Sequence, residues 1–306
     1  MRHDGDTRRA PESSRVLVLR ILVTGADGFT GVHFVRQARA ADHEIVELTA
    51  NLTDSAAVKS QVAKAAPEAV VHLAAISFVG HSQASAFYDV NVIGTLNLLD
   101  ALQGLAQAPR QILLASSANV YGNCDQSPIA ETQAPAPVNH YAMSKLSMEF
   151  LAKTYADKLS LFFVRPFNYT GPGQAASFVI PKLVSHFQRR AVAVELGNLH
   201  VEREYNDVRM VCDVYLKLLE RAQKGATYNI CTGITHTLGH VIDVLTELTG
   251  HHIQVRVNPD FVRANEIHRL CGNPGKLIQT LGTLPAVTLR DTLQSMLMAE
   301  QGSPAQ

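Results

Sequence analysis

Short apolar runs alternate with stretches of helical periodicity along the first half of the chain. The apolar runs predict strands at residues 20–24, 43–49, 70–75 and 111–117. Apolar residues spaced three or four apart predict helices in between, the first ending near Ala40, the second beginning near Ser55 and the third opening at Asn91. Strands and helices in this alternation predict an α/β fold with a parallel, doubly wound sheet.

The second half of the chain has a different pattern and predicts a smaller α/β lobe. Amphipathic helices are expected at residues 238–248 and 289–298, where they would cover this lobe. We predict a first domain over residues 20–167, rejoined by about 207–232, and a lobe made of residues 168–206 and 233–300. Residues 1–19 are rich in charge and have no long apolar core, so we expect a disordered leader and not a secretory signal.

A glycine triplet follows the first predicted strand directly. Gly25, Gly28 and Gly31 are spaced G-x-x-G-x-x-G in the turn that opens the first helix. Gly25 permits the tight turn, Gly28 lets the backbone approach a pyrophosphate, and Gly31 lets the helix pack closely on the strand. A plain turn is the alternative, but the position between a strand and a helix favours a dinucleotide site on a Rossmann-like sheet.

The end of the second strand distinguishes NAD from NADP in such sites, through an acidic residue or an arginine. Thr49, Ala50 and Asn51 stand there, so the sequence leaves the choice between NADH and NADPH open. Asn51 and Leu52 are candidates for contact with the adenine edge, and a plain loop is the alternative. Asp54 is expected to cap the helix that follows.

Tyr141 and Lys145 lie four residues apart in a segment of helical periodicity, so they share one face of the helix. A free tyrosine has a pKa of about 10 and a free lysine a pKa of about 10.4. A cation beside a phenol favours the phenolate, so we expect Lys145 to lower the pKa of Tyr141 and to make it a usable general acid and base. A chance pairing on a helix is the alternative.

Composition narrows the class of protein. The 306-residue chain has 27 basic and 27 acidic residues, so no net field attracts nucleic acid or an anionic membrane surface. No apolar run approaches the roughly 20 residues that span a bilayer. The four cysteines have neither C-x-x-C pairing nor zinc-ligand spacing, so we predict no metal site and expect free thiols in a cytoplasmic protein.

Several motifs together resemble the extended short-chain dehydrogenase/reductase family. They are the glycine triplet, Ser117-Ala-Asn-Val-Tyr-Gly122 and Tyr141-x-x-x-Lys145. Later segments are similar to those of GDP-6-deoxy-4-keto-sugar reductases, namely Val164-Arg-Pro-Phe-Asn-Tyr-Thr-Gly-Pro-Gly-Gln174, Ser177-Phe-Val-Ile180, Leu196-Gly-Asn-Leu199 with Arg203, Tyr228-Asn-Ile-Cys-Thr-Gly233, and Arg263-x-x-Glu266. The resemblance covers nearly all of residues 20–300. It departs from the family pattern at His140, where Pro is frequent, and at Tyr169, where these reductases have His.

The resemblance implies a hydride-transfer site. Tyr141 would be the acid and base, Lys145 would bind the nicotinamide ribose, and Ser117 would hydrogen-bond the sugar oxygen at C4. The residues predicted to bind the coenzyme are Gly25, Gly28, Phe29, Thr30, Gly31, Asn51, Leu52, Leu73, Ala74, Ala75, Asn91, Tyr141 and Lys145. Those implied to bind the substrate are Ser117, Asn168, Ser177, Val179, Asn198, Leu199, Arg203, Arg263 and Glu266, with Asn168 and the two arginines at the diphosphate.

The implied reaction is the reduction, by NADH or NADPH, of the C4 ketone of a GDP-6-deoxy-4-keto sugar, giving GDP-rhamnose or a 6-deoxyheptose analogue. A 4,6-dehydratase is disfavoured, because it needs a carboxylate beside the catalytic Ser or Thr and Ala118 and Asn119 cannot ionise. A 4-epimerase with the same Tyr and Lys stays open, as does a redox-silent dinucleotide sensor, although such sensors usually lack one of the two. The resemblance also implies a homodimer formed by the helices near 91–104 and 141–156.

Overall fold

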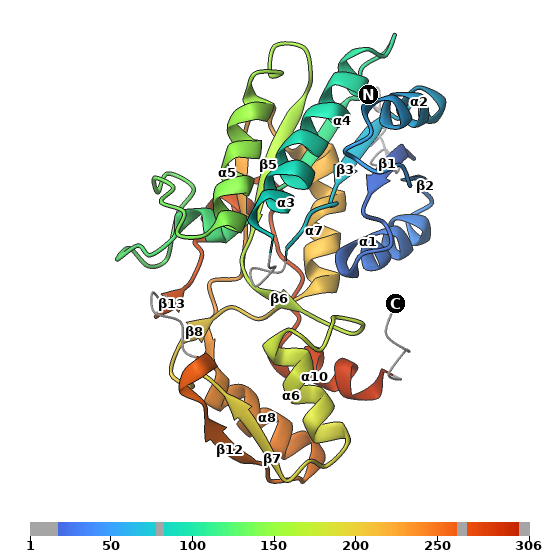
Figure 1. Cartoon of the computed structure of the whole chain (residues 1–306). Coiled ribbons are helices and arrows are strands. Elements are labelled where there is room, and N and C mark those ends of the chain that lie inside the picture. The colour runs from blue at the N-terminus through green and yellow to red at the C-terminus, as the bar shows by residue number, and fades with distance from the viewer. Residues whose placement is uncertain (1–17, 78–82, 262–267, 300–306) are drawn as a thin grey trace, which may run out of the picture.

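The computed structural model describes residues 18–77, 83–261 and 268–299. Within them the largest element is a six-stranded parallel sheet with the order β10-β5-β4-β3-β1-β2 (Figure 1). Its strands are β1 (Arg20–Thr24), β2 (Glu44–Leu48), β3 (Ala69–His72), β4 (Gln111–Ala115), β5 (Leu161–Pro166) and β10 (Thr227–Ile230). The predicted doubly wound parallel sheet is confirmed.

Helices cover both faces of this sheet, which explains why its strands are apolar without alternation (Figure 1). One face packs against α1 (Phe29–Ala40) and α7 (Val208–Arg221), and the other against α2 (Ser55–Ala65), α4 (Gly94–Gln103) and α5 (His140–Lys153). Successive side chains of a strand point to opposite faces, so Ile21 and Val23 belong to the first core and Leu22 to the second.

The strand order reverses between β1 and β3, and in open α/β sheets ligands bind at the carboxyl ends of the strands beside such a reversal. The glycine turn follows β1, and residues 73–75 follow β3. Ser117 follows β4 and Asn168 follows β5 on the same edge of the sheet. The fold therefore brings several of the predicted site segments to one edge.

A smaller lobe lies beyond this edge (Figure 1). Its core is formed by α6 (Val179–Gln188), α8 (Leu238–Thr249), α10 (Leu289–Met298) and the parallel pair β7 (Ala193–Leu196) and β12 (Gln254–Val257). A small sheet has the order β11-β8-β13, with β8 at Glu202–Arg203, β11 at His236–Thr237 and β13 at Arg269–Leu270. The pair β6 (Tyr169–Thr170) and β9 (Asn206–Asp207) lies between the lobe and the large sheet. α9 (Gly275–Leu281) contacts α7 and β10.

The chain returns to the large sheet through α7 and β10, as expected for the segment 207–232, while the domain boundaries stay a prediction. Leu19 is already buried, and the predicted leader at residues 1–17 lies outside the described residues. In the described part of the chain, every helix is too short or too polar to cross a bilayer.

Two predicted strands and one predicted helix differ from the structure. β3 ends at His72 instead of residue 75, because the Ala74 amide donates to the Thr24 side chain and not to a strand backbone. β4 likewise ends at Ala115 instead of residue 117. The helix expected to open at Asn91 is preceded by α3 (Ala84–Tyr88) and a π-helical turn (Asp89–Ile93), so Asn91 lies inside a wider turn.

Candidate functional site

The glycine turn after β1 has no room for side chains at two of its three glycines. Gly25 has φ +67°, and a Cβ there would lie 2.8 Å from the backbone of Ala74. A Cβ at Gly31 would lie 2.0 Å from the carbonyl oxygen of Gly25. Gly28 is the N-cap of α1, where no side chain caps the helix and no acidic residue occupies the first turn. The first amides of α1 are therefore available to an anion, as a pyrophosphate requires.

A buried hydrogen-bond chain lies behind this turn and fixes the protonation of His72. Thr95 Oγ1 donates to the Asn91 carbonyl (2.8 Å), so it must accept from His72 Nε2 (2.9 Å). His72 Nδ1 then accepts from Thr24 Oγ1 (2.7 Å), which itself accepts from the Ala74 amide (3.1 Å). Burial lowers the pKa of His72 to about 3, which agrees with a neutral ring. His72 is therefore a packed core histidine with both ring nitrogens bonded.

Asn91, one of the predicted coenzyme residues, has its side-chain amide engaged by the protein. Its Oδ1 accepts from the Ile76 amide (2.9 Å), and its Nδ2 donates to the Ile76 carbonyl (3.1 Å) and to Ser144 Oγ (2.9 Å). Ser144 Oγ donates in turn to the Tyr141 carbonyl (2.8 Å). Asn91 is thus a connector between the segment after β3 and the helix of Tyr141. A direct contact of its amide with coenzyme does not fit this geometry.

Tyr141 and Lys145 lie on α5, whose N-terminus is capped by Asn139 through a bond from the Ala142 amide (2.8 Å). Both side chains are buried, at 9% and 4% exposure. The Lys145 ammonium donates to the Ala115 carbonyl at the end of β4 (2.7 Å). The end of β4 and the first turns of α5 therefore meet through this lysine.

Ser117 is the third of the predicted catalytic residues. Its Oγ accepts two bonds from Asn119, one from the backbone amide and one from Nδ2, each 3.1 Å. Its own hydroxyl hydrogen then serves the bond to Tyr141. The structure thus brings the three predicted catalytic side chains together. Asn119 is a site residue that sequence reasoning treated only as a missing acid, although an amide two positions from a serine can hold its hydroxyl.

The pKa of Tyr141 does not shift as predicted. Burial raises it above the ordinary value, and the hydrogen bond from Ser117 opposes this only in part. The expectation that Lys145 lowers the pKa of Tyr141 is therefore wrong for the net shift, because desolvation of the phenolate dominates. Burial also lowers the pKa of Lys145 to about 8, against the opposing charge of Glu149.

Tyr169 links the candidate coenzyme turn to the lobe, which no sequence signal indicated. Its hydroxyl lies 2.8 Å from Thr30 Oγ1, and its ring stacks on Phe29 with centroids 6.0 Å apart. Both partners were predicted to bind coenzyme, and this stays a prediction; in the structure their side chains contact Tyr169. Their backbone amides, at the start of α1, remain the groups that face an anion.

The loop after β2 is a well-formed turn. Asn51 Oδ1 accepts from the amide and the hydroxyl of Thr53 (3.0 and 2.9 Å), and Leu52 is buried with its carbonyl bonded to Asn97 Nδ2 (2.8 Å). Asp54 caps α2 as predicted. The plain-loop interpretation of Asn51 accounts for these bonds, and adenine contact by Asn51 and Leu52 stays a prediction.

The predicted substrate residues lie around the β6–β9 pair and the lobe. The Asn168 carbonyl accepts from the Asn206 amide (3.0 Å), three residues after Arg203. Val179 and Leu199 pack on the same core, which brings α6 and the loop after β7 together. Asn198 Oδ1 accepts from the His200 amide, Arg203 Nη1 donates to the Glu202 carbonyl, and Ser177 is exposed just before α6. Arg263 and Glu266 lie outside the described residues.

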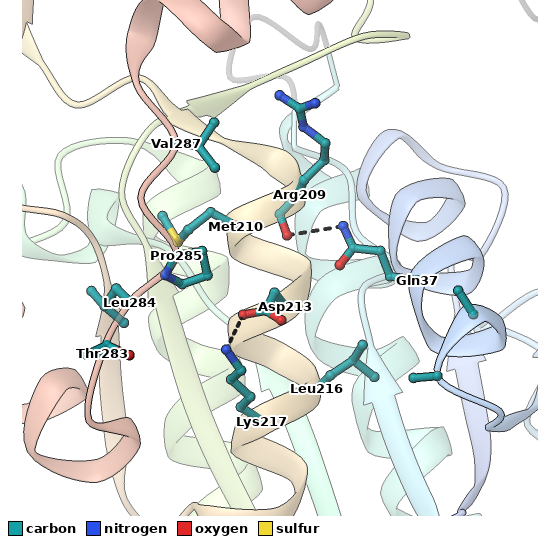
Figure 2. A pocket seen from close by; sticks show the side chains of 12 residues that line it. Gln37, Arg209, Met210, Asp213, Leu216, Lys217, Thr283, Leu284, Pro285 and Val287 are labelled. Atoms are coloured by element: carbon teal, nitrogen blue, oxygen red, sulfur yellow. Dashed lines mark hydrogen bonds and ion pairs between the residues drawn. The ribbon is translucent and has the colours of Figure 1, made fainter.

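A groove of about 620 Å³ lies elsewhere, between α1, α7 and residues 283–287 (Figure 2). Its Lys217 and Asp213 pair with each other (2.7 Å), and Gln37 Nε2 donates to the Arg209 carbonyl (3.2 Å). Of the predicted site residues that the structure describes, none is among the residues that line it. This groove is therefore separate from the candidate site.

Comparisons with known proteins agree with the motifs. The family model of GDP-mannose 4,6 dehydratase matches residues 35–296. The GDP-6-deoxy-D-talose 4-dehydrogenase of Aggregatibacter actinomycetemcomitans is 38% identical over 269 residues, which cover 86% of this chain and 92% of the relative. The GDP-6-deoxy-D-mannose reductase of Pseudomonas aeruginosa is 31% identical over 293 residues, which cover 91% of this chain and 96% of the relative.

A solved structure gives the same result for the fold. The structure of RMD from Pseudomonas aeruginosa complexed with NADPH superposes with a TM-score of 0.85 at 30% identity and covers 92% of this chain and 98% of that one. The family match begins within α1 and includes Ser117, Tyr141 and Lys145 and most of the lobe. The chain therefore belongs to the GDP-mannose 4,6 dehydratase family of extended short-chain dehydrogenases/reductases.

Proposed function

We propose that the chain is an oxidoreductase that reduces the C4 ketone of a GDP-6-deoxy-4-keto sugar with NADH or NADPH. The observation that carries this proposal is the meeting of Ser117, Tyr141 and Lys145 at the sheet edge that also holds the glycine turn. The shape of that turn fits a dinucleotide pyrophosphate, and the relative solved with NADPH supports a nicotinamide coenzyme.

Each of the three side chains has a chemical task in this reaction. The coenzyme, when bound, supplies the hydride. As negative charge grows on the C4 oxygen, Tyr141 donates its phenolic proton to that oxygen. Ser117, whose Oγ is held by two bonds from Asn119, turns its hydroxyl hydrogen from Tyr141 to this oxygen when the sugar is bound and offers it a second hydrogen bond. Lys145 provides a buried cation near the phenol, which stabilises Tyr141 after it has given up its proton.

Dehydration fits this site less well, although the family model bears the name of a dehydratase. Elimination requires a base for the C5 proton, and the positions after Ser117 carry Ala118 and Asn119. The Asn119 amide is bonded to Ser117 Oγ and has no ionisable proton. We therefore place the chain with the reductases of the family.

The configuration of the product at C4 is the finer question. 6-Deoxy-talose and 6-deoxy-mannose differ only at C4, so the names of the two relatives describe the same ketone chemistry on opposite faces of the sugar. The sequence resemblance favours GDP-rhamnose, which is GDP-6-deoxy-mannose, or a 6-deoxyheptose analogue. The 38% identical relative favours the GDP-6-deoxy-talose configuration. The substrate ketone is common to the two hexose products.

We also propose that the enzyme works as a cytoplasmic homodimer. Met143 and Phe150 on α5 are 42% and 60% exposed, and Ile93 just before α4 is 45% exposed. Large apolar side chains gathered on neighbouring helices are typical of an interface between subunits. The resemblance assigns the dimer contact to these same helices. A sedimentation experiment with Phe150→Lys, which should yield monomers, tests this assignment.

The function is tested by offering the 4-keto product of a GDP-mannose dehydratase with each reduced coenzyme and identifying the sugar by NMR. Oxidation of coenzyme with formation of GDP-6-deoxy-talose or GDP-rhamnose supports the proposal and determines the C4 configuration. Consumption of GDP-mannose itself would assign a dehydratase. Interconversion of C4 epimers without net coenzyme use would assign an epimerase.

A further inference from the structure

Beneath the candidate site lies a buried ion pair that the reaction itself does not use. Glu149 is one helical turn beyond Lys145 on α5 and is 0% exposed. Both of its oxygens are bonded by Arg165 of β5, at 2.9 Å from Nε and 2.6 Å from Nη2. The Arg165 guanidinium also lies 4.9 Å from the centre of the Tyr121 ring. The carboxylate is therefore held by paired bonds from a single guanidinium, which itself lies over the Tyr121 ring.

The charged and titratable groups around Lys145 come from three elements. Tyr141 precedes it on α5, His72 faces it from β3, and Glu149 follows it on α5 with Arg165 of β5 behind. The tautomer of His72 leaves it neutral, and Tyr141 is a neutral phenol before reaction. Of these groups, Glu149 is the anion. Its charge opposes the effect of burial on the pKa of Lys145.

The stability of the fold alone is a weak explanation for such a pair. Replacing a buried ion pair by neutral groups of similar volume is often neutral or stabilising, because desolvation of two charges costs as much as their attraction returns. An ammonium that is 4% exposed, by contrast, needs a nearby anion to stay charged. The i,i+4 spacing on one helix places the carboxylate where it can act in this way.

We propose that Glu149, clamped by Arg165, is a positioning residue that supplies the counter-charge for the Lys145 ammonium and keeps that cation in place beside Tyr141. This role rests on the proposed function, in which the cation assists the phenol. Arg165 acts one step further back, because its two bonds hold Glu149 as a carboxylate with a fixed orientation. A lysine at position 165 would keep the charge and lose the paired bonds.

The test is a titration of the Lys145 side chain by NMR in protein labelled at lysine, with the signal assigned by its loss in Lys145→Arg. The wild type should titrate at a pH of about 8. The double variant Glu149→Gln/Arg165→Gln removes both charges and keeps two amides that can bond each other. In it the Lys145 titration should move to lower pH by about half a unit or more. Arg165→Lys, which keeps the charge and loses the paired bonds, should move it in the same direction by a smaller amount.

Two further variants guard against misfolding and indirect effects. Glu149→Asp keeps the charge on a shorter side chain, so the Lys145 titration should move to lower pH by less than in the double variant. This variant replaces the double variant if the latter does not fold. Glu131→Gln is the matched control, since Glu131 Oε1 accepts from the Asn229 amide and does not act on Lys145. It should leave the Lys145 titration in place. An unshifted titration in a folded double variant, or in Glu149→Asp where the double variant does not fold, overturns the proposal.

Failure of the proposed function can be distinguished from failure of the role of Glu149, because the Lys145 titration needs no substrate. If the wild type reduces the keto sugar, the fall of kcat/KM at alkaline pH should move with the NMR titration in each variant. A shifted titration in a protein that reduces no 4-keto sugar would leave the role of Glu149 intact and refute the reaction. A shifted titration with an unmoved alkaline limb would overturn the link between Lys145 and catalysis.

Discussion

The hydroxyl of Tyr169 lies 2.8 Å from that of Thr30 and joins segments 139 residues apart. Thr30 is in the first turn of α1, directly after the glycine turn, and Tyr169 begins β6 at the junction with the lobe. Burial raises the pKa of Tyr169, so the phenol stays protonated and serves as a hydrogen-bond partner. The candidate coenzyme turn and the lobe are therefore joined by a neutral, half-buried contact.

Tyr169→Phe should lower the free energy of unfolding by about 1 kcal/mol, because it leaves the half-buried Thr30 hydroxyl without this partner. It should also weaken coenzyme binding severalfold, since Thr30 shapes the start of α1. Urea denaturation and coenzyme titration measure the two effects. Tyr88→Phe removes an exposed phenol bonded to His140 and is the control, with a change within about 0.5 kcal/mol. Equal stabilities of the two variants would contradict the coupling.

Tyr141→Phe should reduce turnover by about 10²- to 10⁴-fold, the usual contribution of a general acid, and leave coenzyme affinity within about twofold. Steady-state kinetics and coenzyme titration separate the two. Tyr155→Phe, which removes the phenol bonded to Asp100 on the outside of α4, should retain turnover. If Tyr141→Phe retained it as well, the phenol would not be the proton donor.

Lys145→Met should stabilise the folded protein at pH 7 while it abolishes activity. The folded pKa of about 8 lies below the ordinary 10.5, so the unfolded chain binds the proton more tightly. The buried ammonium thus opposes folding below pH 8, by about 3 kcal/mol, and this cost fades as pH rises towards 10.5. Urea denaturation at pH 7 and pH 10 should show a stabilisation that shrinks at the higher pH. Lys153→Met, at an exposed position of the same helix, should show neither effect.

His72 should make the protein sensitive to acid. Its folded pKa of about 3 lies below the ordinary 6.5, so stability falls as pH drops from about 6.5 towards 3, by about 3–5 kcal/mol. His72→Asn, which has no titrating ring, should be less stable at pH 7 and lose less on acidification. Parallel curves of unfolding free energy against pH for the two proteins would refute this role.

Much of the fold follows from local patterns in the sequence. The buried strands are runs of apolar residues such as Ile21, Leu22 and Val23, and α10 runs from Leu289 to Met298 as its periodicity predicts. The glycine triplet is informative for the same reason, because Gly25 has φ +67° and a Cβ on Gly31 would meet the Gly25 carbonyl within the same turn. Each of these signals depends on neighbours in sequence or on one strand-to-helix turn.

The connections within the site depend on tertiary pairing and were not predictable. Tyr169 reaches Thr30 only because β6 pairs with β9, and Arg165 reaches Glu149 only because β5 packs beneath α5. The direction of the Tyr141 pKa shift was misjudged for a related reason. Residue spacing gives the position of Lys145 but does not reveal the burial of Tyr141, which has the largest effect on the pKa of its phenol.

The pairing of β5 with β10 has a consequence for synthesis of the chain. These strands are neighbours in the sheet, but the residues of β6 to α7 lie between them in sequence. A nascent chain that has just released β5 therefore exposes an open, apolar strand edge on the ribosome, and such edges recruit other chains. Closure of this edge waits until Thr227–Ile230 has emerged, so the large sheet cannot be completed before residues 168–206 of the lobe have been translated.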